Sequence, residues 1–404
     1  MKKEKIKEAV KKINTPFFIY DEAILNRNIN RIIEASKNAN IGGRIRLFAS
    51  YFTNSNPNLF KSIQNESVGI LLQTPEEWHQ LKPFGLNREM ITSPSFLSNE
   101  EIDFWTNKNI TINLASFEEI RYFVQKYKKA PLSFRIDATF WQKQRTGLKI
   151  KQLKEISEFL KNQSVTPYSF HIYCGTGSSL KKIKKYLIRS LKIYRKYFPN
   201  VKEINLGGGF AYDYKSLLVE EKHFDWSSYF AYLKQKIKEF NISPEVRFIL
   251  EPGRDIFADI GVQVLKVKRV VNYPNLKSVS TDGSYVFMPS AAKRNRKHNL
   301  DFYDQNFNLI PKEECFSTKL SGSTTLSSDY IMPNVVQIPE PIKESDYIVV
   351  KDLGAYGATQ HMEFLNKKPC PEILIDNEGK LKLITTEGVE ADKTRYALLT
   401  PKLL

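Results

Sequence analysis

The stretch from 168 to 208 carries the repeating pattern of this chain. A short apolar run, YSFHIY (168–173), is followed by a longer amphipathic segment and a second apolar run, EINLGG (203–208). Strand-length apolar runs separated by helix-length segments predict βα units in a parallel sheet. The alternation extends from residue 44 to residue 257, and its eight apolar runs are RIRLFAS, VGILL, EMITS, ITINLA, LSFRID, YSFHIY, EINLGG and RFILEP.

Eight βα units in about 210 residues are typical of a (β/α)8 TIM barrel, in which catalytic groups lie at the carboxyl ends of the strands. Three predicted helices begin with the spacing of a capping box, in which a hydroxyl and a carboxylate satisfy the free amides of the first turn. The pairs are Thr74 and Glu77, Ser98 and Glu101, and Ser116 and Glu119. An open, doubly wound sheet is the alternative α/β architecture.

After residue 257 the pattern changes to alternating β-type runs separated by Gly, Asn and Pro, which predicts a mainly β second domain. The runs are VQVLKVKRVV, YIVVKD, EILID and KLKLITT. The early segment TPFFIYD also resembles a strand, and we expect it to join this domain. The predicted organisation is a first β-domain strand within 1–24, a barrel over 25–262 and a C-terminal β domain over 263–404.

The composition is that of a folded protein. With 404 residues and 41% apolar content, the chain exceeds the usual size of one hydrophobic core. No segment reaches the roughly 18 apolar residues of a membrane span, and the basic N-terminus lacks an apolar run, so we expect a cytoplasmic location. The cysteines Cys174, Cys315 and Cys370 are odd in number and lack CxxC spacing, which argues against disulfides and against a zinc site.

The formal net charge of +17 is compatible with nucleic acid, an anionic surface or an acidic substrate as partner. The densest group of cations lies between Lys181 and Lys196, and apolar residues recur through it at helical spacing: Ile183, Leu187, Leu191 and Tyr194. This spacing predicts an amphipathic helix whose cations face solvent. Aromatic residues do not interleave with basic ones as stacking on single strands requires, so we favour a partner other than nucleic acid.

Glycine-rich junctions follow the last three predicted barrel strands. The run Gly207–Gly209 lets backbone amides approach an anion closely, although a tight turn has the same composition. The EPGR motif places Glu251 and Arg254 at the same mouth, and a guanidinium suits phosphate. In CGTGS, Thr176 and Ser178 either add hydroxyls to this corner or cap the next helix. Together these junctions predict a phosphate pocket.

Three motifs in this order, GGGFAYDY (207–214), EPGRDIFADIGVQV (251–264) and DLGAYGA (352–358), resemble those of the fold type III decarboxylases, which use pyridoxal 5'-phosphate (PLP). The family includes ornithine, diaminopimelate and arginine decarboxylases, and the resemblance covers nearly the whole chain. The resemblance implies an alanine-racemase-like barrel and a β domain that completes the active site across a homodimer interface. The implied reaction is α-decarboxylation of an amino acid, with PLP as electron sink.

The resemblance also implies roles for individual residues. The residues implied on the cofactor's phosphate side are Thr176, Gly207, Gly208, Gly209, Gly253, Arg254 and Tyr356. Glu251 would pair with the pyridine nitrogen, and Tyr173 occupies the position of a histidine that stacks on the ring. Arg135 either supports the site or forms an ion pair at the barrel mouth.

Besides Tyr173, three further positions depart from the family pattern. The Schiff-base lysine at the end of the first strand corresponds to Tyr51, and a phenol cannot condense with an aldehyde as an amine does. An active enzyme would therefore need either another amine or noncovalently held PLP. The proton-donor cysteine corresponds to Thr325, a far weaker acid, and an acidic substrate-binding residue corresponds to Leu326, whereas Asp329 is retained.

These departures leave three functions open. The first is a diverged amino-acid decarboxylase that keeps the phosphate pocket. The second is a catalytically inactive homologue, a pseudoenzyme that acts as a binding or regulatory partner. The third is an enzyme redirected to another phosphorylated or acidic ligand, which the basic loop KRNRKH (293–298) suggests, although exposed charge runs usually have no partner.

Overall fold

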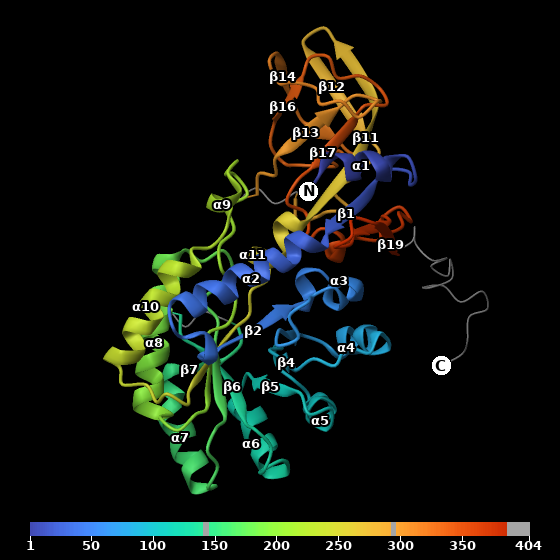
Figure 1. The fold of residues 1–404 in the computed structure, drawn as a ribbon. Helices are drawn as coiled ribbons and strands as arrows, with labels where there is room; N and C mark the ends of the chain where they lie inside the picture. The colour runs from blue at the N-terminus through green and yellow to red at the C-terminus, as the bar shows by residue number, and fades with distance from the viewer. Residues whose placement is uncertain (140–144, 292–295, 386–404) are drawn as a thin grey trace, which may run out of the picture. The chain divides into compact units, whose positions relative to one another are not determined.

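The computed structural model of the protein describes residues 1–139, 145–291 and 296–385 (Figure 1). The chain divides into two compact units. One unit is continuous and consists of Leu25–Phe257, whereas the other combines Met1–Ile24 with the chain from Ala258 onward.

The first unit contains a closed barrel of eight parallel strands. The strand order is β5-β4-β3-β2-β10-β9-β8-β6, and pairing of β5 with β6 closes the barrel. The strands are β2 (Ile45–Ser50), β3 (Gly69–Leu72), β4 (Met90–Thr92), β5 (Thr111–Leu114), β6 (Ser133–Asp137), β8 (Ser169–Ile172), β9 (Glu203–Asn205) and β10 (Arg247–Leu250). Each lies in one of the eight predicted runs, so the (β/α)8 barrel is confirmed and the open sheet is excluded. A short strand, β7 (Leu148–Lys149), pairs with β6.

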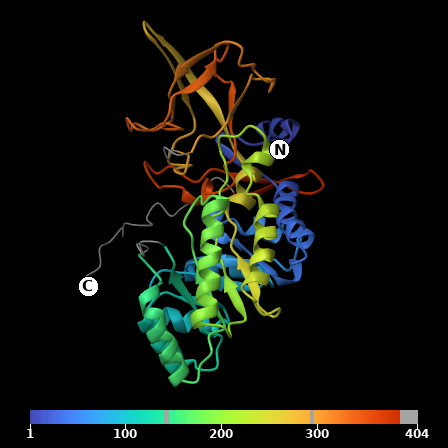
Figure 2. The same ribbon diagram turned by 90° about the vertical axis from the view of Figure 1, so that its left-hand side faces the viewer.

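Helices follow the strands and cover the outside of the barrel, and Figure 2 shows α8 and α10 side by side there. The helices are α2 (Glu22–Asn38), α3 (Pro57–Lys61), α4 (Pro75–Leu81), α5 (Asn99–Asn107), α6 (Phe117–Lys126), α7 (Leu153–Asn162), α8 (Leu180–Tyr197), α9 (Val219–Lys222), α10 (Trp226–Glu239) and α11 (Arg254–Phe257). As predicted, α8 is amphipathic. The apolar side chains predicted to face the core are buried, namely those of Ile183, Leu187, Leu191 and Tyr194.

The predicted capping pairs do mark helix starts. The hydroxyls of Thr74, Ser98 and Ser116 each accept a hydrogen bond from the amide three residues later. At α5 the box is reciprocal, because the carboxylate of Glu101 accepts from the amide of Ser98 at 2.8 Å. At α4 and α6 the glutamate accepts instead from the amide that precedes the cap. The capping-box spacing therefore predicted the helix starts correctly, even at α4 and α6, where the glutamate carboxylate binds a different amide.

The second unit is built on a mixed sheet in the order β13-β17-β11-β1-β18-β19. Its strands are β1 (Phe17–Asp21), β11 (Gly261–Tyr273), β13 (Leu300–Tyr303), β17 (Tyr347–Val350), β18 (Glu372–Ile375) and β19 (Leu381–Thr385). Strands β12 (Leu276–Thr281) and β15 (Leu320–Ser321) extend it from β11, while β14 (Cys315–Thr318) and β16 (Val336–Pro339) pair separately. The four β-type runs predicted after residue 257 are β11, β17, β18 and β19.

Strand β1 lies inside this sheet, antiparallel to β11 and parallel to β18. Its residues Phe17, Phe18, Ile19 and Tyr20 are each at most 1% exposed, so both faces of the strand are covered. Phe17 and Ile19 share a core with Ile6 and Ala9 of helix α1 (Lys3–Val10). The expectation that TPFFIYD joins the β domain is therefore correct. Among the described residues, no helix is both long and apolar enough to cross a membrane.

Candidate functional site

The glycine-rich junctions meet at the carboxyl ends of β8, β9 and β10, which are neighbours in the barrel. The amide of Ser178 donates to the carbonyl of Gly209 at 2.7 Å, and the amide of Glu251 donates to the carbonyl of Gly207 at 3.0 Å. Because these bonds join all three junctions, the convergence expected from the sequence is present.

The glycine run is required by close contact between backbones. A Cβ atom on Gly207, Gly208 or Gly209 would lie 2.2–2.4 Å from the carbonyl oxygens of Ile172, Glu251 and Gly175, respectively. Gly207 and Gly209 also have φ angles of +67° and +89°, which favour glycine. Within the described part of the chain, the amides of Gly208 and Gly209 donate no hydrogen bond, so they are available to an anion.

Glu251 is a buried carboxylate, 5% exposed, with several polar neighbours. Asn205 donates its amide Nδ2 to Oε1 at 2.7 Å, and Nε2 of His171 lies 3.4 Å from Oε2. Burial opposes ionisation, but His171, Asn205 and Arg135 together outweigh it and hold the pKa of Glu251 below its usual value. The site therefore holds an ionised carboxylate beneath the glycine run.

A chain of hydrogen bonds continues from Glu251 across the barrel interior. Ser93 lies 3.5 Å from Oε1 of Glu251 and accepts from Nδ2 of Asn113 at 2.7 Å. Ser133 donates to Oδ1 of Asn113 and accepts from Ser169, both at 2.6 Å. These side chains are all buried, so this polar network links β4, β5, β6 and β8 to the junction after β10.

Tyr173 and Thr176 form a pair above β8. The two hydroxyl oxygens are 2.8 Å apart, and the guanidinium carbon of Arg135 lies 5.5 Å from the centre of the Tyr173 ring. Burial lowers the pKa of Arg135, while Glu251 opposes that effect. The capping alternative for Thr176 and Ser178 is not realised, because the α8 cap is Ser179.

The residues before and after Arg254, Gly253 and Asp255, are both fixed by contacts with other segments of the barrel unit. A Cβ on Gly253 would lie 2.4 Å from Oγ1 of Thr53, so the two segments are in close contact. The next residue, Asp255, is completely buried and accepts from Nη2 of Arg31 at 2.7 Å and from Nε1 of Trp226 at 2.6 Å. These contacts fix the start of α11, where Arg254 is half-buried.

Tyr51 follows β2 directly and is completely buried. Its hydroxyl donates to the carbonyl of Ser55 at 2.8 Å, and its ring centre lies 5.0 Å from that of Phe60 in α3. The next lysine in the chain, Lys61, is the last residue of α3. The Tyr51 side chain thus packs and hydrogen-bonds within the first unit.

The second unit carries the remaining predicted residues. Thr325 is exposed and Leu326 is half-buried. Asp329 is 4% exposed, and its carboxylate accepts from Oγ of Ser284 at 3.0 Å, from the amide of Thr324 at 2.8 Å and from Oγ1 of Thr324 at 2.7 Å. Asp329 therefore holds the 322–329 loop in shape.

Tyr356 also belongs to the second unit, where it has a φ of +59°. The guanidinium carbon of Arg296 lies 5.9 Å from the centre of its ring. Of the predicted basic loop, Arg296, Lys297 and His298 are described, whereas Lys293, Arg294 and Asn295 lie outside the described residues.

Several residues of the site were not predicted as such. His171, Asn205, Ser93 and Asn113 surround Glu251, and Asp255 fixes the turn at Arg254. Their sequence signal is a polar side chain inside or beside an otherwise apolar barrel strand. Such a side chain must be paired when it is buried, and it therefore marks a network in the barrel interior.

Residues 26–258 match the family described as pyridoxal-dependent decarboxylase, pyridoxal binding domain. The chain is 22% identical to the diaminopimelate decarboxylase of Buchnera aphidicola subsp. Acyrthosiphon pisum, over 96% of this chain and 95% of that protein. It is 25% identical to the diaminopimelate decarboxylase of Thermoplasma acidophilum, over 93% of this chain and 91% of that protein.

Solved structures show the same fold. The diaminopimelate decarboxylase of M. jannaschii, in complex with L-lysine, superposes with a TM-score of 0.84 at 20% identity, covering 99% of this chain and 95% of that one. The Helicobacter pylori enzyme, also with L-lysine, gives a TM-score of 0.80 at 20% identity, covering 96% of this chain and 98% of that one. The alanine-racemase-like barrel with a β domain is therefore confirmed.

Proposed function

This chain belongs to the pyridoxal-dependent decarboxylases, and from that premise we propose that it removes the α-carboxylate of an amino acid with noncovalently held PLP as cofactor. PLP is supported as the cofactor by the pyridoxal-binding domain that the chain carries. The bound cofactor supplies a sink for the electrons that departing carbon dioxide leaves behind. The observation that carries the proposal is the buried carboxylate of Glu251 beside a glycine run in which, within the described residues, the amides of Gly208 and Gly209 donate no hydrogen bond.

The phosphate side of the site fits this cofactor. The run Gly207–Gly209 presents backbone amides, and Arg254 stands at the first turn of α11, where its planar donors suit a phosphate. Thr176 adds a hydroxyl that Tyr173 orients. We assign phosphate binding to these groups, with the close packing at Gly253 holding the Arg254 turn in place.

Glu251 is the group we assign to the pyridine nitrogen. An ionised carboxylate can accept about four hydrogen bonds, so the bonds from Asn205 and Ser93 leave it free to accept another. Because its pKa is lowered, Glu251 keeps a partner nitrogen protonated rather than taking the proton itself. Tyr173, held beside Arg135, offers the face on which an aromatic ring stacks.

The end of β2 does not fit a covalent link. Tyr51 stands there, and its hydroxyl is engaged with the carbonyl of Ser55. We therefore propose that the cofactor is retained by its phosphate and ring contacts. Among the described lysines, Nζ of Lys182 lies 3.2 Å from the position of a Cβ on Gly175, and Lys149 donates to Asp137 at 2.8 Å.

We propose that the second unit adds Thr325, Asp329 and Tyr356 to the site in a homodimer. Asp329 shapes the loop on which Thr325 is exposed, so Thr325 is not buried in its own unit, which supports this proposal. Light scattering after gel filtration tests the assembly. A monomer at micromolar concentration would argue against a site shared between two copies.

The proposed function is tested by loading the purified protein with PLP and recording absorbance, thermal stability and carbon dioxide release from a panel of amino acids. We expect a cofactor band, a stabilised fold and release from at least one amino acid. Borohydride treatment followed by peptide mass spectrometry should find no lysine joined to the cofactor. A cofactor band without any release would favour the inactive homologue. The absence of both a band and stabilisation would overturn the cofactor site.

A further inference from the structure

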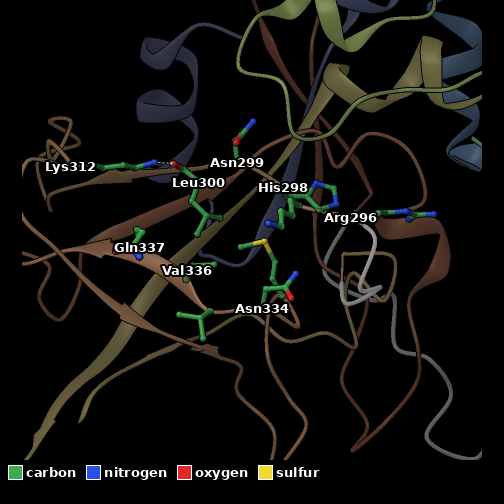
Figure 3. A pocket seen from close by; sticks show the side chains of 11 residues that line it. Arg296, His298, Asn299, Leu300, Lys312, Asn334, Val336 and Gln337 are labelled. Atoms are coloured by element: carbon green, nitrogen blue, oxygen red, sulfur yellow. Dashed lines mark hydrogen bonds between the residues drawn. The ribbon is translucent and has the colours of Figure 1, made fainter. Parts of the chain in front are cut away.

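The second unit contains a pocket of about 240 Å³ that none of the residues proposed for the cofactor lines (Figure 3). A water in the liquid occupies about 30 Å³, so the volume has room for roughly eight waters or for an organic molecule of similar size. The pocket lies wholly within the second unit, between the start of β13 and the start of β16.

The lining combines cations with apolar side chains. Its basic members are Arg296, Lys297, His298 and Lys312, and no Asp or Glu of the described residues lines it. Leu300 and Met332, 6% and 4% exposed, are its buried apolar members. Figure 3 shows Leu300 and Val336 among the polar side chains, so a bound molecule meets both kinds of surface. Such a lining suits a small anion that has an apolar body.

Lys312 is the cation with the clearest capacity for a ligand. Its ammonium donates one hydrogen bond, to the carbonyl of Leu300 at 2.6 Å, and lies 5.4 Å from the centre of the Phe302 ring. An ammonium has three donors, so two remain. Among the described residues, no carboxylate forms an ion pair with Lys312. Within the part of the chain that the structure describes, its charge therefore has no carboxylate to neutralise it.

We propose that this pocket binds a small carboxylate with an aliphatic chain. The carboxylate contacts the ammonium of Lys312 and the positive charge contributed by Lys297, because charge-assisted hydrogen bonds are the strong ones. The aliphatic chain contacts Leu300, Met332 and Val336, where it leaves water. None of the residues proposed for the cofactor lines this site, although the guanidinium carbon of Arg296, which does line it, lies 5.9 Å from the ring centre of Tyr356.

Pentanoate is the first probe, titrated calorimetrically into the full-length protein at fixed ionic strength. We expect saturable binding with a Kd of about 1 mM or tighter. Pentylamine, of similar shape but opposite charge, should not bind, and inorganic phosphate should bind at least about fivefold more weakly because it has no apolar part. Equal affinity for pentylamine would overturn the role of charge. Equal affinity for phosphate would overturn the role of the aliphatic chain.

Lys312→Met keeps the aliphatic stem and removes the charge, so it should weaken pentanoate binding by about fivefold or more. Lys268→Met is the matched control, because Lys268 is exposed on β11 and does not line the pocket. Equal loss in the two variants, or no loss in either, would overturn the proposal. Thermal unfolding without ligand checks that both variants fold.

A measurement without substitution locates the site. Pentanoate should protect Lys297 and Lys312 from an amine-acylating reagent, whereas Lys268 should react at an unchanged rate, as followed by peptide mass spectrometry. Saturable binding with no protection at these two lysines would place the ligand elsewhere and overturn the assignment.

Discussion

Nε2 of His171 lies 3.4 Å from Oε2 of Glu251 inside the barrel, and both residues are at most 5% exposed. The pair brings a β8 side chain against the junction after β10. A carboxylate buried this deeply keeps its charge only because polar neighbours replace the water it has lost.

This relationship predicts how stability responds to acid. The pKa of Glu251 lies below the usual value of a glutamate, so its ionised form stabilises the fold above that usual value, and the contribution is lost as the pH falls through the folded-state pKa. His171→Ala removes the largest of the influences that lower this pKa, so we expect the pKa to rise. We expect the acid-unfolding midpoint to move to higher pH, with a loss of about 3 kcal/mol at pH 7.

Urea unfolding between pH 4 and pH 8 measures this effect. His171→Gln, which can still donate through its side-chain amide, is the comparison and should recover part of the loss. An unchanged acid midpoint in His171→Ala would show that His171 does not control the ionisation of Glu251.

The glycine run makes a steric prediction. In Gly208→Ala, the new Cβ would lie 2.3 Å from the carbonyl oxygen of Glu251, and backbone cannot retreat as a flexible side chain can. We expect a loss of about 3 kcal/mol in the free energy of unfolding. Gly43→Ala has nothing within 4 Å of its Cβ and should change stability by less than about 0.5 kcal/mol. Chemical unfolding measures the free energy of unfolding of both variants. If Gly208→Ala and Gly43→Ala lose the same amount, the backbone at Gly208 is not closely packed.

Arg254 makes a prediction about the cofactor. Arg254→Gln removes the guanidinium proposed to bind the phosphate, and we expect the Kd for PLP to rise about tenfold or more. Arg121→Gln is the control, because its side chain is 57% exposed on α6 of the same unit. Absorbance titration measures both variants. Unaltered PLP affinity in a folded Arg254→Gln protein would remove Arg254 from the site.

Tyr51→Phe separates packing from contact with the cofactor. The variant keeps the ring against Phe60 and loses the hydrogen bond to Ser55, which should cost about 1 kcal/mol of stability. PLP affinity should stay the same, because the hydroxyl is already engaged. Equilibrium dialysis measures the affinity for PLP. If the affinity falls by more than the lower stability of the variant explains, the phenol hydroxyl contacts the cofactor.

The loop around Asp329 gives a test in the second unit. Asp329→Ala leaves the donors of Ser284 and Thr324 without an acceptor and should destabilise this unit by about 3 kcal/mol. Asp329→Asn keeps one oxygen acceptor and should lose less. Hydrogen exchange, which reports each unit separately, is the measurement. Equal protection in both variants and the wild type would show that the carboxylate does not hold the loop.

The barrel could be predicted because its signals are local. Eight apolar runs became eight strands, and the hydroxyls of Thr74, Ser98 and Ser116 marked three helix starts. The grouping of Gly207–Gly209 with Glu251 was also predictable, since parallel strands bring their carboxyl ends to one mouth.

The partners of these residues could not be predicted in the same way. The bond from Asn205 to Glu251 and the contact of Asp255 with Arg31 join residues far apart in sequence. The role of Tyr51 was equally hidden. The sequence shows that the lysine amine is missing at this position. That the phenol hydroxyl donates to the carbonyl of Ser55 depends on how the backbone folds between the two residues. Side-chain pairing across elements is set by three-dimensional packing, which no spacing rule encodes.

The position of β1 between β11 and β18 has a consequence for biosynthesis. A ribosome that has just made Phe17–Asp21 must still synthesise the whole barrel before β11 emerges, and more again before β18. At about 5–20 residues per second, that delay is on the order of tens of seconds. Throughout it, a strand destined for burial on both faces has no partner. The barrel can fold while translation continues, but the β unit must wait for its last strands, and until then β1 lacks one or both of the strands between which it is buried.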